Sequence, residues 1–240
     1  MTALDDYLPA YKRDFAYQFD NEIMLNWYAK RIVELTSPNS SALELGVGHG
    51  YSCDLFSKYY SKYRVIDGSS AVIENYKQAF PASIIEIVES YFEDYDHSEK
   101  FDIIIMGFVL EHVDSPAAIL AKYRTLLKPG GVCFVAVPNA ESLHRRFAHA
   151  AGLMDDMASL SESDRLLGHK RYYTARFLAE TMEEAGYRVV RKEGIFLKSL
   201  TTRQLTSLNL SPEILQGMCR VAIDYPELSA GLLFEGGAAE

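Results

Sequence analysis

Cysteine is scarce in this chain of 240 residues, and so are long apolar runs and positive charge. The three cysteines, Cys53, Cys133 and Cys219, are odd in number, far apart and without a CxxC pair, so they indicate neither a disulfide framework nor a zinc ribbon. No apolar stretch approaches the ~20 residues that cross a bilayer, so we expect no membrane span. The first residues lack a basic segment followed by an apolar one, so we expect no secretory signal and a cytoplasmic location.

Basic residues are outnumbered by acidic ones. The 24 lysines and arginines face 33 aspartates and glutamates, which gives a formal net charge of −9 at pH 7. Such a surface repels a phosphate backbone, so we expect no extended nucleic-acid binding. Arginine-rich clusters can still bind a phosphate or carboxylate on a small molecule, or they can be solvated helix faces. The candidate substrate-binding residues of this kind are Arg145, Lys170 and Arg171.

Apolar residues make up 48% of the chain, and neither an internal repeat nor a linker divides it, so we expect one domain over residues 1–240. Strand patterns at 42–45, 64–67, 83–88, 101–106 and 132–137 alternate with helical patterns at 51–60, 70–78 and 116–127. This alternation predicts parallel β-α-β units with right-handed crossovers. The second half predicts a helical insertion, a helix at 175–185, a strand at 188–197, a helical region at 202–224 and a strand at 228–234.

The segment from Leu43 to Gly50 reads LELGVGHG and carries the strongest chemical signal. Glycines between a strand and a helix let a ligand approach the backbone closely, because no Cβ intervenes. Their spacing is not the GxGxxG of dinucleotide binders, which disfavours a dehydrogenase. Asp67 ends the next strand pattern, 21 residues after Gly46. A carboxylate there can accept both hydroxyls of a ribose, and a helix N-cap is its alternative role.

Four blocks in this order carry a resemblance: ALELGVGHG, VIDGSS, FDIIIMGFVLEHVDSP and LLKPGGVCFVAVPN. With them the chain resembles the class I S-adenosylmethionine-dependent methyltransferases, in particular their ubiquinone-biosynthesis-like, small-molecule branch. The resemblance covers residues 22–138 well and GHKRYYTARFLAETMEEAGYRVV more loosely. It implies S-adenosylmethionine as cofactor and an α/β fold. The implied sheet is doubly wound, seven-stranded and mostly parallel, with order 3-2-1-4-5-7-6, an antiparallel last strand and helices on both faces.

The resemblance also implies which residues meet the cofactor. The glycines and Glu44 are expected at the methionine end, Asp67 and Gly68 at the ribose, and the turn after the third strand at the adenine. This turn lacks the Gly-Asp of many relatives, and core packing is the alternative role for its phenylalanine and for Phe108. The implied cofactor residues are Glu44, Gly46, Gly48, Gly50, Asp67, Gly68, Tyr91, Phe92, Gly107 and Phe108.

Two further segments are expected to enclose the substrate. Residues 1–36 are interpreted as an N-terminal helical lid, because the resembling enzymes often close a front helix over the cofactor. Residues 139–174 are interpreted as an inserted segment on the acceptor side.

Two histidines are candidate bases for an acceptor that must lose a proton. His112 follows the fourth strand, where a doubly wound sheet opens its ligand crevice. His169 lies in the segment that borders the acceptor pocket in the resembling enzymes, and a structural role is the alternative for each. Glu111, His112 and Asp114 can also be read as metal ligands, but methyl transfer needs no metal and we expect none. Cys53 has no evident base partner, so a nucleophilic role is disfavoured.

The hypothesis favoured by these features is methyl transfer to a hydroxyl of a small molecule, with a sugar or glycan precursor preferred by analogy alone. Methylation of a small amine or amino sugar is the enzymatic alternative. An alternative of another class is a non-catalytic cofactor-binding subunit that serves a partner. A small-molecule acceptor is the expected partner, and the sequence leaves undecided whether the chain forms a homodimer.

Overall fold

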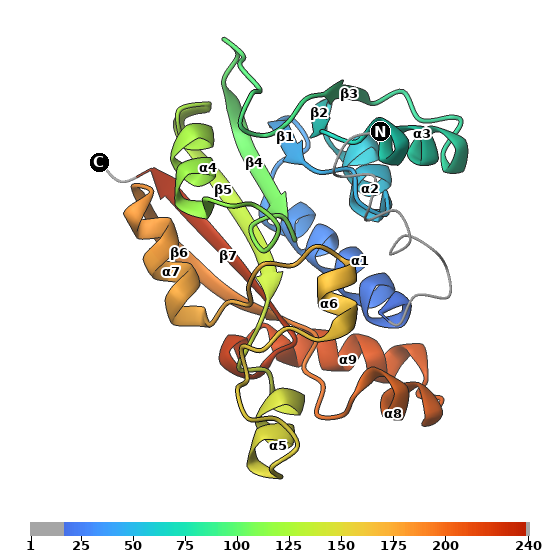
Figure 1. Ribbon diagram of the computed structural model, residues 1–240. Helices are drawn as coiled ribbons and strands as arrows, with labels where there is room; N and C mark the ends of the chain where they lie inside the picture. Colours follow the sequence, from blue (N-terminus) through green and yellow to red (C-terminus); the bar gives the residue numbers. More distant parts are fainter. Residues whose placement is uncertain (1–16, 239–240) are drawn as a thin grey trace.

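The computed structural model describes residues 17–238, and within them a seven-stranded sheet lies between helices (Figure 1). Its strands are β1 Ser41–Leu45, β2 Lys62–Asp67, β3 Glu86–Glu89, β4 Phe101–Gly107, β5 Leu127–Pro138, β6 Tyr187–Ile195 and β7 Gly231–Ala238. The strand order is β3-β2-β1-β4-β5-β7-β6, and only β7 runs antiparallel to its neighbours β5 and β6. The predicted strand order and antiparallel last strand are confirmed.

The helices alternate with these strands in the first half of the chain, and several of those in the second half lie near one end of the sheet (Figure 1). They are α1 Gln18–Leu35, α2 Tyr51–Tyr59, α3 Ser70–Ala79, α4 Pro116–Arg124, α5 Leu143–Ala150, α6 Glu162–Leu166, α7 Ala175–Glu184, α8 Thr202–Ser207 and α9 Pro212–Ala222, with a 3-10 turn at Pro226–Leu228. Residues 1–16 of the expected lid lie outside the described residues. None of the helices within residues 17–238 combines the length and apolar character that a bilayer span requires.

Side-chain alternation along the strands builds a hydrophobic core on each face of the sheet. In β1, Leu43 and Leu45 pack toward the face that α4 and α7 cover. Ala42 packs toward the face covered by α1, α2 and α9. Figure 1 shows these helices on opposite sides of the sheet. Glu44, between the two leucines, therefore lies on the α1 and α2 side.

Several element boundaries differ from the sequence prediction, and three of the differences have a clear structural reason. Strand β5 begins at Leu127, five residues before the expected start, because Leu127 already pairs with Phe101 of β4. The next pair is Val132 with Ile103, so the Pro-Gly-Gly segment between them is a bulge within the strand. The helical region 202–224 is two helices, since Asn209 adopts a left-handed conformation (φ 45°) between them. The 3-10 turn delays β7 to Gly231.

The carboxyl ends of β1, β2 and β4 meet at one edge of the sheet, where parallel α/β folds bind their ligands. The chain that follows β5 returns across this edge. It forms α5 and α6 beyond the ends of β4 and β5 (Figure 1). Asn139 then pairs with Tyr173, so residues 139–174 form a loop that begins and ends at the same place. This loop and α1 lie on either side of this edge of the sheet and enclose the space above it.

Candidate active site

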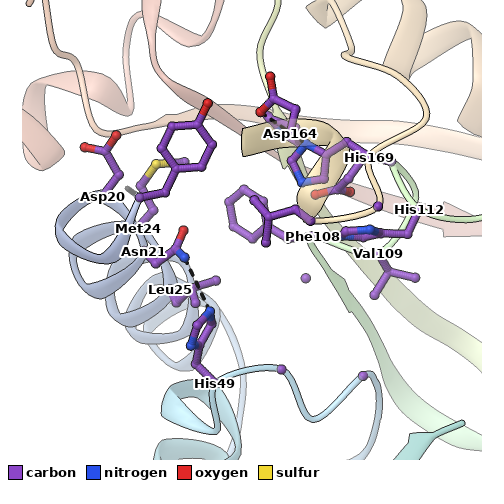
Figure 2. Close-up of a pocket in the computed structure, with 18 of the residues that line it drawn as sticks. Asp20, Asn21, Met24, Leu25, His49, Phe108, Val109, His112, Asp164 and His169 are labelled. Atoms are coloured by element: carbon purple, nitrogen blue, oxygen red, sulfur yellow. Dashed lines mark hydrogen bonds and ion pairs between the residues drawn. The ribbon is translucent and has the colours of Figure 1, made fainter. Parts of the chain in front are cut away.

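A cavity of about 790 Å³ opens at this edge of the sheet. Small-molecule sites usually measure roughly 300–1,000 Å³, so one cofactor and an acceptor are a reasonable filling. Figure 2 shows α1 on one side of the cavity and Phe108, His112 and His169 on the other. Nine of the ten residues predicted to meet the cofactor line it: Gly46, Gly48, Gly50, Asp67, Gly68, Tyr91, Phe92, Gly107 and Phe108.

The glycines of the first loop serve different purposes. Gly48 has a positive φ of 53°, and a Cβ built on it would meet no atom within 4 Å, so its open side leaves room for a ligand. Gly50 also has a positive φ, but its Cβ would lie 2.7 Å from the Tyr76 ring and 2.8 Å from the Phe80 ring. Gly50 is therefore a packing requirement of the α2 N-terminus as well as a lining residue.

Asp67 braces the two loops that could hold a nucleoside. Its Oδ2 accepts a bond from the Val47 N–H, and its Oδ1 accepts one from the Ser69 N–H, each at 2.8 Å. Burial raises the pKa of this carboxyl above its usual value. The N-cap of α3 is Ser69, whose side chain accepts from the Val72 N–H, so helix capping by Asp67 itself does not explain the residue. Each Asp67 oxygen retains a lone pair for a ligand hydroxyl.

Glu44 is the one predicted cofactor residue that does not line the cavity. Its carboxylate is 1% exposed and faces α1 and α2, where it accepts from the hydroxyl groups of Tyr28 and Tyr63 and from the Cys53 thiol. Burial raises its pKa to about 6. Strand parity turns the Glu44 side chain toward α1 and α2, whereas the cavity lies beyond the end of β1 and is lined by the loop that follows Leu45. The expected role of Glu44 at the methionine end of the cofactor, directly or through water, stays a prediction.

The predicted aromatic contacts differ in their surroundings. Tyr91 is 42% exposed at the cavity rim, whereas Phe92 packs partly against the core on the α4 and α7 face. Phe108 has a positive φ of 57°, and its ring packs edge-on against Tyr28 at 5.8 Å. Tyr28 also fills the space where a Gly107 side chain would be. Phe92 and Phe108 therefore both pack against the protein core and line the cavity.

The structure places His169 beside an acidic residue that the sequence analysis did not identify. Its Nδ1 lies 3.6 Å from Oδ1 of Asp164, and that carboxylate is completely buried. Asp164 is held by Tyr172, which donates to Oδ1, and by Ser161, whose N–H and hydroxyl donate to Oδ2. Burial lowers the pKa of His169, while the Asp164 charge acts in the opposite direction. A neutral imidazole with an adjacent carboxylate is the arrangement that general-base histidines use.

His112 lies against His169 on the same wall. The two rings are edge-on, with centroids 4.8 Å apart. Burial, together with the charge of His169, lowers the pKa of His112 to about 3, so it stays neutral. Next to it, Glu111 is fully buried and neither carboxyl oxygen has a hydrogen-bond partner. Burial raises the Glu111 pKa to about 8, so the carboxyl group is mostly protonated at neutral pH.

Glu111, His112 and His169 offer ligand atoms within 4.8 Å of one another, and in residues 17–238 they are the one such group that could hold a metal ion. Asp114, the third residue of the trio considered from the sequence, instead pairs with Lys170 on the surface. The expectation that the protein uses no metal stays a prediction.

The three candidate anion-binding residues already have protein partners. Arg145 donates to the carbonyls of Met157 and Ser159 and stacks on Tyr172. Arg171 donates to three backbone carbonyls of residues 110–114. Arg145 and Lys170 line the cavity, but the guanidinium of Arg145 closes residues 139–174 on themselves. Their binding of an acceptor stays a prediction.

The sequence analysis did not identify Asp20, Asp164 and Lys198 of the cavity wall as site residues. Asp20 and Lys198 are 178 positions apart, and no local pattern links them. The capping box of Ser161 and Asp164 at the start of α6 can be recognised in the sequence, but such a pattern predicts the start of a helix and not a functional site.

Comparison with known proteins agrees with this geometry. Residues 20–192 match the family described as methyltransferase domain. The ubiquinone biosynthesis O-methyltransferase of Pasteurella multocida (strain Pm70) is 29% identical over 132 residues, which are 50% of this chain and 54% of that protein. The chain spans about half the length of the curated relatives it matches.

Two solved structures share the fold. The N-methyltransferase NodS from Bradyrhizobium japonicum WM9, in complex with S-adenosyl-L-homocysteine, has a TM-score of 0.57 and 15% identity, covering 99% of this chain and 94% of its own. A Haloferax volcanii protein solved in complex with the Trm112 methyltransferase activator has a TM-score of 0.65 and 16% identity, covering 100% and 98%. Since the family match extends from α1 into β6, the chain belongs to the methyltransferase-domain family, as a class I methyltransferase that uses S-adenosylmethionine.

Proposed function

We propose that this domain transfers the methyl group of S-adenosylmethionine to a hydroxyl oxygen of a small-molecule acceptor. The observation that carries the proposal is the His169–Asp164 pair in the cavity wall, because an oxygen acceptor has a proton to lose and this pair can take it. The similarity to the ubiquinone biosynthesis O-methyltransferase of Pasteurella multocida supports the same acceptor atom.

The cofactor half of the cavity lies over the ends of β1 and β2. We assign the methionine part to the loop that contains Gly46 and Gly48, since Gly48 leaves open space there. Asp67 would accept the ribose hydroxyls with its remaining lone pairs, and Tyr91 and Phe92 would border the adenine. The bound cofactor supplies an activated methyl group on a sulfonium, so the protein needs no further activation of the leaving group.

The acceptor half lies between α1 and residues 139–174. The described part of the expected lid contributes Asn21, Met24 and Leu25 to this wall, and Figure 2 shows them facing Phe108 across the cavity. These walls would align the acceptor and exclude water, and alignment alone can lower the barrier by ~7–11 kcal/mol.

His169 would remove the acceptor proton. With its Nδ1 toward Asp164, its Nε2 is the nitrogen left to accept the hydroxyl proton as the oxygen attacks the methyl carbon. Asp164 would hold the ring in this orientation and stabilise the imidazolium that forms. His112, neutral and edge-on, limits the positions that the His169 ring can take.

The test is the pair of variants His169→Ala and His149→Ala. His149 is an exposed histidine near the end of α5 and does not line the cavity, so it controls for loss of a histidine. The acceptor is first identified by a labelled-methyl screen. With this acceptor, His169→Ala should lower kcat by about 10²–10⁴, the usual size of a general-base effect. Affinity for S-adenosylhomocysteine should stay unchanged. A loss below about threefold would contradict the proposed base and favour an amine acceptor.

A further inference from the structure

A buried ion pair joins α1 to the segment after β6 inside the cavity wall. The Lys198 ammonium donates to Oδ2 of Asp20, and the hydroxyl of Thr202 donates to the same oxygen. Lys198 also donates to the Thr202 oxygen at 3.1 Å. Lys198 is 3% exposed and Asp20 is 8% exposed, and all three residues line the cavity that contains His169.

This cluster has hydrogen-bonding capacity that the protein does not use. Oδ1 of Asp20 is buried and has no partner. The Lys198 ammonium has three N–H donors, and two of them are taken by Asp20 and Thr202. His144, on α5 at the same end of the cavity, has a buried Nδ1 without a partner. Buried polar groups in folded proteins nearly always have hydrogen-bond partners. Because these residues line the cavity, a bound ligand can supply the missing hydrogen bonds.

The charges of the cluster decide which ligand fits. Asp20 and Lys198 neutralise each other, and His144 adds no charge because burial and the Lys198 ammonium lower its pKa to about 3. Any ligand ion bound there would face both charges, an ammonium at Asp20 lying next to Lys198 and an anion at Lys198 lying next to Asp20. The pair has no net charge to offset that of a buried ion, so either would be disfavoured. A hydroxyl group can donate to Asp20, and a neighbouring hydroxyl can accept from Lys198.

We propose that Asp20 and Lys198 form an acceptor-recognition subsite for an uncharged molecule with two adjacent hydroxyl groups. The subsite rests on the proposed function, since it selects the class of hydroxyl acceptor that His169 would deprotonate. Figure 2 shows Asp20 across the cavity from Phe108 and His169, so a ring-sized diol bound by the pair would lie between them. The subsite disfavours small amines and anions as acceptors.

Binding to the protein saturated with S-adenosylhomocysteine tests this subsite without requiring turnover. The probes are trans-1,2-cyclohexanediol and catechol, each compared by NMR titration with its single-hydroxyl partner, cyclohexanol or phenol, and with trans-2-aminocyclohexanol. The wild-type protein should bind at least one diol about tenfold more tightly than its single-hydroxyl partner and the amino alcohol, as expected for one hydrogen bond to a charged group. The two diols distinguish an aliphatic from an aromatic source.

Variants identify the residues responsible. In Asp20→Asn, the preference for the diol over the single hydroxyl should fall about tenfold. Glu22→Gln, an exposed carboxylate two positions along the same helix, should keep it. Lys198→Met should shift the preference toward the amino alcohol, because Asp20 then carries an unpaired charge. Since that variant leaves a buried charge without its partner, the double variant Asp20→Asn with Lys198→Met provides a second, uncharged test, and it should lose the diol preference.

The outcomes separate this subsite from the proposed function. A merely structural tie between α1 and α8 would lower the melting temperature of Asp20→Asn but leave the preference for the diol over the single hydroxyl unchanged, and that result would overturn the subsite. A wild-type preference for the amino alcohol would also overturn it. Transfer of the methyl group to a hydroxyl with an unaltered acceptor preference in both Asp20 variants would leave the proposed function standing and remove only the subsite.

Discussion

His169 Nδ1 lies 3.6 Å from Oδ1 of Asp164, a carboxylate that the capping box of α6 holds completely buried. The distance is slightly longer than a hydrogen bond, and such bonds in unliganded sites often tighten when substrate binds. The backbone N–H of His169 also donates to the Asp164 carbonyl at 2.9 Å, which fixes the two residues relative to each other. The turn after α6 thus carries both a base and the charge that orients it.

The pH profile of methyl transfer should report this pair. His169 must be neutral to accept a proton, and burial lowers its pKa below the usual ~6.5. We therefore expect the acid limb of kcat/KM to lie below the pH at which an ordinary histidine titrates. Asp164→Asn removes the charge that supports the protonated ring, so it should move the acid limb still lower and reduce kcat by about 10²–10⁴. An unchanged limb in Asp164→Asn would mean that Asp164 only caps α6.

Asp67→Ala should weaken the binding of S-adenosylhomocysteine roughly ten- to a hundredfold, because the ribose hydroxyls lose a charged acceptor. Isothermal calorimetry measures this directly. Ser69→Ala is the matched control, since it removes the α3 cap next to the same loop. Equal losses in the two variants would show that loop integrity, and not a ribose contact, explains the effect.

Gly48→Ala and Gly50→Ala should fail in different ways. Both substitutions place a side chain at positive φ, which costs roughly 1–2 kcal/mol. Gly50→Ala also forces a Cβ against Tyr76 and Phe80, so it should lower the melting temperature more. Gly48→Ala meets no protein atom, but its methyl group enters the proposed methionine site. It should lower S-adenosylhomocysteine affinity at least about tenfold; normal affinity would place the methionine elsewhere.

Glu111 should make the domain less stable as the pH rises. Burial raises its pKa to about 8 in the folded chain, against ~4.3 when unfolded. The folded state therefore holds the proton more tightly, and this contribution is complete below about pH 4 and is lost as the pH rises through 8. The slope is at most ~1.4 kcal/mol per pH unit. Urea unfolding at pH 5 and 8.5 should show a smaller pH difference for Glu111→Gln than for wild type, whereas Glu22→Gln should match wild type.

The parts of the fold that follow from local signals were predictable. The glycine loop and Asp67 each end a strand pattern, and parallel strands bring such ends to one edge, so their shared position in the cavity needed only the topology. The start of β5 was not predictable in this way. Its Pro-Gly-Gly segment usually marks a turn, and it becomes a bulge within the strand only because Leu127 before it and Val132 after it both pair with β4.

The polar wall of the cavity was harder to predict, because it depends on contacts between distant segments. Arg145 and Arg171 stood out as cations, yet their donors are taken by backbone carbonyls of neighbouring loops, which have no sequence signature. Asp20 is an acidic residue in the first turn of α1, and nothing in the surrounding sequence distinguishes it from a solvated one. Its partner Lys198 comes from the other end of the chain, so the pair exists only in the fold.

The most direct test is to determine which atom receives the methyl group. The protein is incubated with S-adenosylmethionine labelled with ¹³C in its methyl group, together with matched neutral diols, phenols and amines, and the products are examined by carbon NMR. We expect new O-methyl signals from hydroxyl acceptors, which disappear in His169→Ala and persist in His149→Ala. Label found on nitrogen, or O-methyl product formed equally well by His169→Ala, would contradict the proposed transfer to oxygen with His169 as base.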